Sequence, residues 1–117
     1  MNRKIELLAS YWTLAGDAYA MGPSEVATIP LRDRIEAAAW AGYTGMGFAH
    51  QDLLATRDAI GYAAMKRMLN DNGIVHVEVE FLGDWFTAGD KKRASDAIRR
   101  DLLEAAHELG ARNIKAA

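Results

Sequence analysis

The stretch that decides the fold is NDNGIVHVEVEF, residues 70–81. An amphipathic segment ends at Gly73, and an apolar run that begins at Ile74 follows directly. A glycine just past the end of a helix can adopt the left-handed backbone conformation that turns the chain back. The pattern therefore predicts a helix, a sharp turn and a strand, in that order.

The same pattern, in which an amphipathic segment ends at a glycine and an apolar run follows, occurs at Gly42 and Gly110. They lie 31 residues before and 37 residues after Gly73, which is about the length of one βαβ unit. We expect three helices, over residues 31–41, 59–71 and 91–109. We expect four strands, over residues 5–11, 45–49, 74–80 and 113–116. Strands and helices that alternate in this way predict an α/β fold with a parallel sheet.

A parallel sheet can carry helices on one face, as in a barrel, or on both faces, as in a doubly wound sheet. No phosphate-binding Gly-x-Gly-x-x-Gly follows the first expected strand, and this favours the barrel. The third strand alternates apolar and polar residues, which places His76, Glu78 and Glu80 on one face. Because isolated buried charges are costly, we expect this face to line a polar barrel mouth or to meet solvent.

The composition is that of an ordinary globular protein of one domain: half of the 117 residues are hydrophobic and 26% are charged. The 14 basic and 16 acidic residues give a net charge of −2 without a basic patch, so we expect no nucleic-acid partner. The chain has no cysteine, which excludes disulfides and thiolate metal sites within it. No run approaches the ~20 apolar residues of a membrane span, and the apolar run near the start is too short for a signal peptide. We therefore expect a cytoplasmic protein without a membrane partner.

Chemistry in parallel α/β folds gathers at the carboxyl ends of the strands. His50 follows the second expected strand, and an imidazole there can act as an acid, a base or a metal ligand. The alternative is a loop histidine that hydrogen-bonds a neighbouring backbone group. Glu80 ends the third strand and is either an acid/base or metal-binding carboxylate, or one arm of a salt bridge. We take His50 and Glu80 as candidate catalytic residues and expect them to face the same mouth.

Four further side chains at the strand ends are candidate substrate-binding residues: Tyr11, Trp12, Gln51 and Trp85. The tryptophans can offer apolar faces to the C–H bonds of a sugar, while Tyr11 and Gln51 can hydrogen-bond its hydroxyls. Aromatic residues in such loops also serve as packing plugs, so this alternative stays open.

Six stretches follow one another in a distinctive order: ASYWT at residues 9–13, LRDRIEAA at 31–38, GYTGMG at 42–47, EVEFLGDW at 78–85, LLEAA at 102–106 and LGARNIK at 109–115. In order and spacing they resemble the N-terminal part of the sugar phosphate isomerase/epimerase family, the xylose-isomerase-like TIM barrels. The resemblance implies a (β/α)8 barrel that uses a divalent metal ion (Mn, Mg, Co or Zn) to isomerise or epimerise a small-molecule sugar or hydroxy-ketone. It further implies that carboxylates move a proton between adjacent carbons. His50 matches the position at which several relatives carry a functional histidine.

A complete barrel needs about 200–250 residues, and in the epimerase-like relatives the principal metal ligands come from later strands. The resemblance therefore implies that residues 1–117 form a single partial domain, the N-terminal half of a TIM barrel. We expect the full-length parent to be the isomerase or epimerase, and this chain alone to be inactive and to bind no metal.

Two alternative functions stay open. One is a non-catalytic half-barrel that forms a homo-oligomer through unpaired sheet edges and an exposed apolar interior face. The other is the endonuclease IV-type nuclease branch, in which His50 would act as a metal ligand. The net charge disfavours DNA as a partner in that branch.

Overall fold

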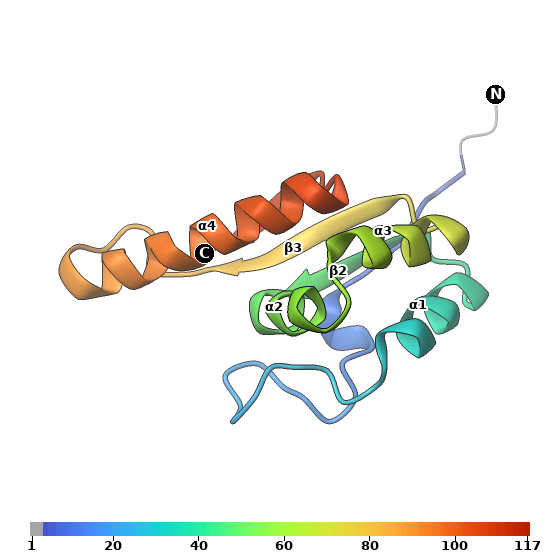
Figure 1. The fold of residues 1–117 in the computed structure, drawn as a ribbon, viewed down its shortest axis with the longest axis horizontal. Coiled ribbons are helices and arrows are strands. Elements are labelled where there is room, and N and C mark those ends of the chain that lie inside the picture. The colour runs from blue at the N-terminus through green and yellow to red at the C-terminus, as the bar shows by residue number, and fades with distance from the viewer. Residues whose placement is uncertain (1–3) are drawn as a thin grey trace.

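The computed structural model describes residues 4–117 and shows an α/β fold (Figure 1). The strands are β1 (Leu8–Ala9), β2 (Gly45–Ala49), β3 (His76–Leu82) and β4 (Asn113–Ala116). The helices are α1 (Leu31–Trp40), α2 (His50–Ala59), α3 (Tyr62–Asp71) and α4 (Gly89–Leu109), and a 3-10 turn, η1 (Tyr11–Thr13), follows β1. The strands form one sheet in the order β1-β2-β3-β4, and every neighbouring pair is parallel. The prediction of an α/β fold with a parallel sheet is confirmed.

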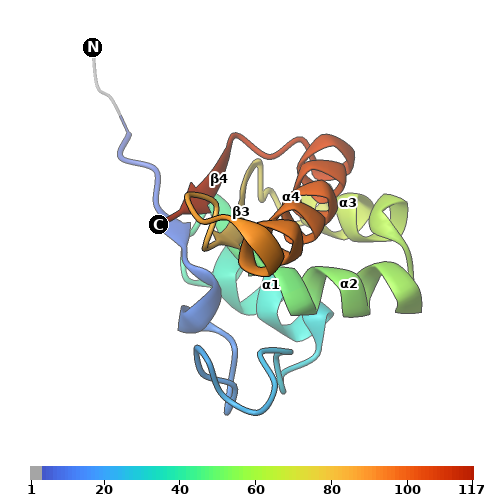
Figure 2. The ribbon, with the colours of Figure 1, turned by 90° about the vertical axis from the view of Figure 1, so that its left-hand side faces the viewer.

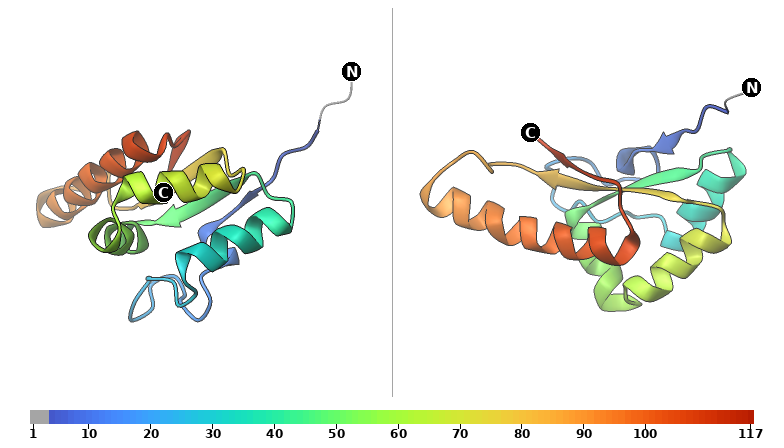
Figure 3. Two further views of the ribbon diagram at one scale, coloured as in Figure 1. Left: turned by 45° about the vertical axis from the view of Figure 1, so that its right-hand side comes forward. Right: turned by 90° about the horizontal axis from the view of Figure 1, so that it is seen from above.

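The four helices cover the same face of the sheet (Figures 2 and 3). Their apolar stripes meet alternate residues of β2 and β3, such as Phe48 and Val79, in one buried cluster. Each helix contributes a side chain that is fully buried in this cluster: Ile35, Leu53, Met65 and Leu102. A sequential strand order with helices on one face is the arrangement of successive β/α units in one half of a barrel.

The face of the sheet without helices, here called the open face, is mostly polar. The register pairs Glu78 with Asn113, and pairs Glu80 with Ala49 on one side and Lys115 on the other. Because side chains alternate between the two faces along a strand, these residues lie together on the open face. The expectation of an exposed apolar interior face is therefore wrong, since alternate residues of β3 and β4 carry charged or amide side chains.

The helix expected over residues 59–71 is the second of two consecutive helices. The structure places α3 there and adds α2, which begins at His50 with no loop after β2. The sequence hides α2 because its buried face carries Asp52 and Thr56 beside Leu53, so no apolar stripe is visible. The three glycines at the predicted helix ends adopt the left-handed backbone conformation, as predicted: the φ values of Gly42, Gly73 and Gly110 are 95°, 71° and 66°.

The first strand is shorter than the expected residues 5–11, because only Leu8 and Ala9 form strand pairs. After Ala9 the chain turns into η1 and passes close over β2. A Cβ atom on Gly47 would lie 3.2 Å from the backbone nitrogen of Tyr11, so this crossing depends on a residue without a side chain. Within residues 4–117, no helix combines the length and the apolar character needed to cross a bilayer.

Candidate functional site

A pocket of about 670 Å³ lies at the carboxyl ends of β2 and β3, beside the first half of α4. Its polar lining comes from four elements and two loops. The residues are His50 and Gln51 from α2, Glu80 from β3, Lys91 and Ser95 from α4, Lys115 from β4, and the loop residues Glu25 and Asp84. Trp12, from η1, adds an aromatic wall. Parallel strands bring these residues together because all of their carboxyl ends meet at the same edge of the sheet.

Four of the six candidate residues line this pocket: Trp12, His50, Gln51 and Glu80. Their catalytic or binding roles stay predictions. Trp85 lies outside the lining, is half exposed, and packs edge-on against Phe86 with ring centroids 5.7 Å apart. It is therefore part of an exposed aromatic pair on the loop that leads into α4.

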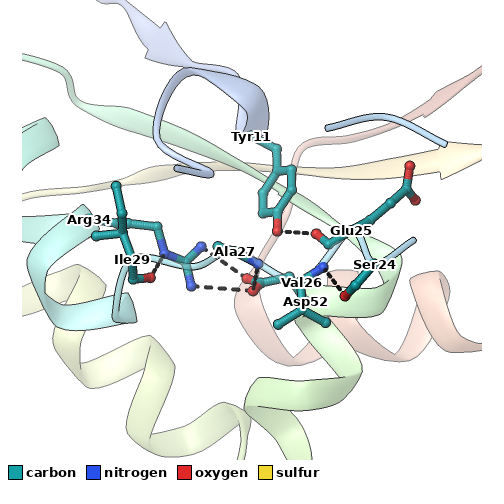
Figure 4. Close-up of polar contacts among 8 residues, drawn as sticks. All are labelled: Tyr11, Ser24, Glu25, Val26, Ala27, Ile29, Arg34 and Asp52. Atoms are coloured by element: carbon teal, nitrogen blue, oxygen red, sulfur yellow. Dashed lines mark hydrogen bonds and ion pairs between the residues drawn. The ribbon is translucent and has the colours of Figure 1, made fainter. Parts of the chain in front are cut away.

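Tyr11 does not line this pocket, and its substrate-binding role stays a prediction. Its hydroxyl points toward the backbone of Glu25 (Figure 4). Its side chain is buried, and its hydroxyl donates a hydrogen bond to the backbone carbonyl of Glu25 at 2.5 Å. Burial, together with the nearby charge of Asp52, raises the pKa of the Tyr11 phenol well above its ordinary range. The ring turns inward because residues 14–30 fold back over it, and Tyr11 therefore anchors this loop as a neutral phenol.

A buried ion pair between Arg34 and Asp52 fixes the same loop (Figure 4). The two guanidinium Nη atoms lie 3.0 and 3.4 Å from the Asp52 carboxylate, and both side chains are at most 5% exposed. Asp52 also accepts the backbone N–H of Ala27 at 3.1 Å, while Arg34 Nε donates to the carbonyl of Ile29 at 2.9 Å. Sequence reasoning did not assign this pair. The available signal was a charged residue on the buried side of each of two helices, α1 and α2.

His50 finds its carboxylate partner on α4 rather than on β3. Its Nε2 lies 2.8 Å from Oδ2 of Asp101, and both side chains are partly buried. His50 is the first residue of α2, one position after Ala49, which is the register partner of Glu80. Both His50 and Glu80 line the pocket, and their expected catalytic roles stay predictions. With Nε2 engaged, Nδ1 is the ring atom left for another partner.

Glu80 is held by a lysine that sequence reasoning missed. The ammonium nitrogen of Lys115 lies 2.7 Å from Oε2 of Glu80 and 3.0 Å from Oε1 of Glu78. The hydrogen bonds to Glu80 and then to Glu78 raise the pKa of Lys115 above its ordinary value. Partial burial opposes ionisation of Glu78, but hydrogen bonds from Asn113 and Lys115 hold the pKa of Glu78 below its ordinary value. The three charged groups form one hydrogen-bonded cluster on the open face, here called the Lys115 cluster.

The Glu80 carboxylate is only partly satisfied. The residue is 2% exposed, and its second oxygen, Oε1, is buried without a hydrogen-bond partner. An unpartnered buried polar atom costs about 1–3 kcal/mol, and native structures carry few of them. The cost is removed when a ligand brings a hydrogen-bond donor to Oε1.

The residues of the site do not fit the divalent metal ion that the family resemblance implies. Across residues 4–117, no group of three or more histidine or carboxylate side chains is placed to hold a metal ion. A lysine ammonium already lies between the two carboxylates of the Lys115 cluster, where a bound cation would neutralise them. We therefore derive no chemical step through a metal.

No protein-family model matches the chain, and no curated protein matches it. The geometry of the pocket and the resemblance of six sequence stretches to the isomerase/epimerase family therefore support the function proposed below.

Proposed function

We propose that this pocket recognises a small sugar or hydroxy-ketone and forms part of the substrate mouth of an isomerase or epimerase. The observation that carries the proposal is the partly satisfied Glu80 carboxylate in a pocket that Trp12 also lines. A buried carboxylate can accept a hydrogen bond from a hydroxyl group, and an indole face can cover the C–H bonds of a sugar. The proposed compartment is the cytoplasm, a reducing environment in keeping with a chain that has no cysteine.

The proposed reaction moves one proton next to a carbonyl group. The Glu80 carboxylate takes the proton from the carbon that bears the hydroxyl, and the electron pair of that C–H bond forms the C=C bond of an enediolate. The carbonyl oxygen gains the negative charge. A proton then returns to the opposite side of the same carbon, which gives an epimer, or to the neighbouring carbon, which gives an isomer after the hydroxyl proton moves between the oxygens. His50, oriented by Asp101, is the candidate for exchanging that oxygen-bound proton through Nδ1.

An NMR titration tests the recognition step. The chain, labelled with ¹⁵N, is titrated with dihydroxyacetone, xylulose or fructose, and with glycerol as a polyol that lacks the carbonyl. We expect shifts of backbone amides around residues 49–51 and 80–84, and about tenfold weaker binding by Glu80→Gln, the loss of one charge-assisted hydrogen bond. The control is Glu108→Gln, which changes an exposed glutamate of α4 outside the pocket. Shifts elsewhere on the molecule, or equal binding by Glu80→Gln and the unchanged protein, would refute the proposal.

A second measurement concerns turnover. We expect isomerase assays on this chain to give no product above background when Mn, Mg or Co is added, because the family resemblance places the remaining functional residues on later strands and residues 4–117 assemble no metal site. Product formation that depends on the added metal would contradict the interpretation that the Lys115 cluster does not bind a metal ion.

Self-association is a second candidate function, and the sheet order favours it. Strands β1 and β4 lie at the two edges of the sheet and pair with a neighbour on one side only. Exposed edges are templates for pairing with another chain. Two copies that paired their edges would enclose the polar open face. Light scattering tests this candidate, and a monomer that persists at high micromolar concentration would count against it.

A further inference from the structure

We infer that the ammonium group of Lys115 binds the carbonyl oxygen of the ligand in this pocket, without help from a metal ion. The inference rests on the proposed function, because it names the partner of an oxygen that only a hydroxy-ketone or sugar would bring. It assigns a binding role to a residue of β4 that lies far from the other polar residues of the pocket in sequence.

The register of β4 fixes where Lys115 lies. It pairs with Glu80 across the sheet, so its side chain crosses the open face toward the carboxyl end of β3. An ammonium group has three N–H donors, and the contacts at 2.7 and 3.0 Å use two of them. The third donor is available to a ligand, because the side chain is 45% exposed and lines the pocket.

The chemistry of the Lys115 cluster restricts what this lysine can do. Its raised pKa keeps the amine protonated at neutral pH, so it donates hydrogen bonds and does not act as a nucleophile toward a carbonyl carbon. A fixed positive charge beside a carbonyl oxygen stabilises the negative charge that develops when the adjacent C–H bond is broken. A metal ion would perform the same task in the relatives that the resemblance names.

The charge balance of the cluster also restricts the ligand. One ammonium and two carboxylates give the cluster a formal net charge of about −1. The other charged residues that line the pocket are Glu25, Asp84 and Lys91, and they bring one further net negative charge. A neutral hydroxy-ketone can place its carbonyl oxygen on Lys115 and direct its hydroxyl toward Oε1 of Glu80. A phosphate or carboxylate group on the ligand would be repelled by Glu78 and Glu80. The cluster therefore favours an uncharged ligand.

Binding measurements on Lys115→Gln test the inference. Glutamine keeps a hydrogen-bond donor for Glu80 and removes the charge, and Lys115→Arg restores the charge with a different shape. The matched control is Lys92→Met, which removes a lysine paired with Asp96 on α4, outside the pocket. Dihydroxyacetone is the probe, followed by NMR with EDTA and again with MnCl₂, and inorganic phosphate is titrated separately.

We expect dihydroxyacetone to bind the unchanged protein equally well with EDTA and with MnCl₂, and more tightly than inorganic phosphate. We expect Lys115→Gln to weaken binding about tenfold, as for the loss of one charge-assisted hydrogen bond. Lys115→Arg should recover part of that loss, and Lys92→Met should match the unchanged protein. Binding that survives in Lys115→Gln, or that requires MnCl₂, would overturn this inference and leave the proposed function standing. If folded unchanged protein bound no hydroxy-ketone at all, the proposed function would fall and this inference with it.

Discussion

Replacing Asp52 with asparagine tests the buried ion pair that fixes the loop over residues 14–30. Asparagine has the shape of aspartate, so the change removes the charge and leaves the packing intact. Arg34 would then keep its full charge at 5% exposure without a countercharge. The single amide oxygen of the asparagine would replace two carboxylate oxygens that accept from Arg34 and from the Ala27 N–H. Breaking a buried pair by removing one partner costs about 3–5 kcal/mol. We expect a loss in that range, which is a large part of the 5–15 kcal/mol that stabilises a typical domain.

Urea unfolding followed by far-ultraviolet circular dichroism measures this loss. The control lies in the same helix: Asp58 pairs with Arg57 at 3.0 Å, but its side chain is 70% exposed. Exposed pairs contribute little because water screens them, so Asp58→Asn should unfold close to the unchanged protein. Both variants remove the charge of an α2 aspartate that is paired with an arginine, so their difference reports mainly the effect of burial.

Equal unfolding free energies for Asp52→Asn and Asp58→Asn would refute the reasoning, because burial would then make no difference to the pair. A lower slope of free energy against urea for Asp52→Asn would have a different meaning. It would show that the loop detaches before the rest of the domain unfolds.

Three further predictions concern other parts of the molecule. His50→Ala should cost about 1 kcal/mol or less, since the residue lies at a strand end and not in the packed core; a large fall in melting temperature with unchanged ligand binding would make His50 structural. Tyr11 and Lys115 both have raised pKa values in the folded protein, so the folded state holds their protons more tightly and stability falls as the pH rises above their ordinary values of 10.0 and 10.5. Tyr11→Phe should therefore flatten the alkaline limb of a plot of unfolding free energy against pH, and an unchanged limb would contradict the assignment. Gly47→Ala should destabilise by about 1–3 kcal/mol, because the added Cβ meets the backbone of the crossing chain; thermal unfolding measures it, and an unchanged melting temperature would show that η1 can shift freely.

Much of the fold follows from local patterns in the sequence. Gly42, Gly73 and Gly110 mark the turns because each requires positive φ, a local property that a glycine reveals. The alternation of apolar and polar residues along β3 is likewise visible within one short stretch of sequence. In contrast, α2 escapes detection because Asp52 is buried by an arginine from another helix, and no window around residues 50–59 shows that partner. The shortness of β1 depends on a contact between Gly47 and η1, which is likewise non-local.

In the candidate site, too, some residues could be predicted from local patterns, and others depend on contacts between segments far apart in the sequence. Trp12, His50, Gln51 and Glu80 line the pocket, as expected from the rule that strand ends converge. Tyr11 lies outside this lining because the long loop after η1 folds back over it, and the Glu25 carbonyl accepts its hydroxyl hydrogen bond. Lys115 was missed because its importance comes from the register between β3 and β4, and a sequence does not display register between strands separated by a 21-residue helix.

The place of Lys115 on β4 has a consequence for the order in which the pocket matures during synthesis. A ribosome releases the chain from the amino end, so β1, β2, β3 and the four helices can leave the exit tunnel before Lys115 does. During that interval Glu78 and Glu80 stand two residues apart on one face with no ammonium between them, and their mutual repulsion opposes closure of that end of the sheet. Docking of β4 supplies the missing countercharge. A released chain truncated before residue 115 should therefore bind a hydroxy-ketone more weakly than the full chain, even when its helices are packed.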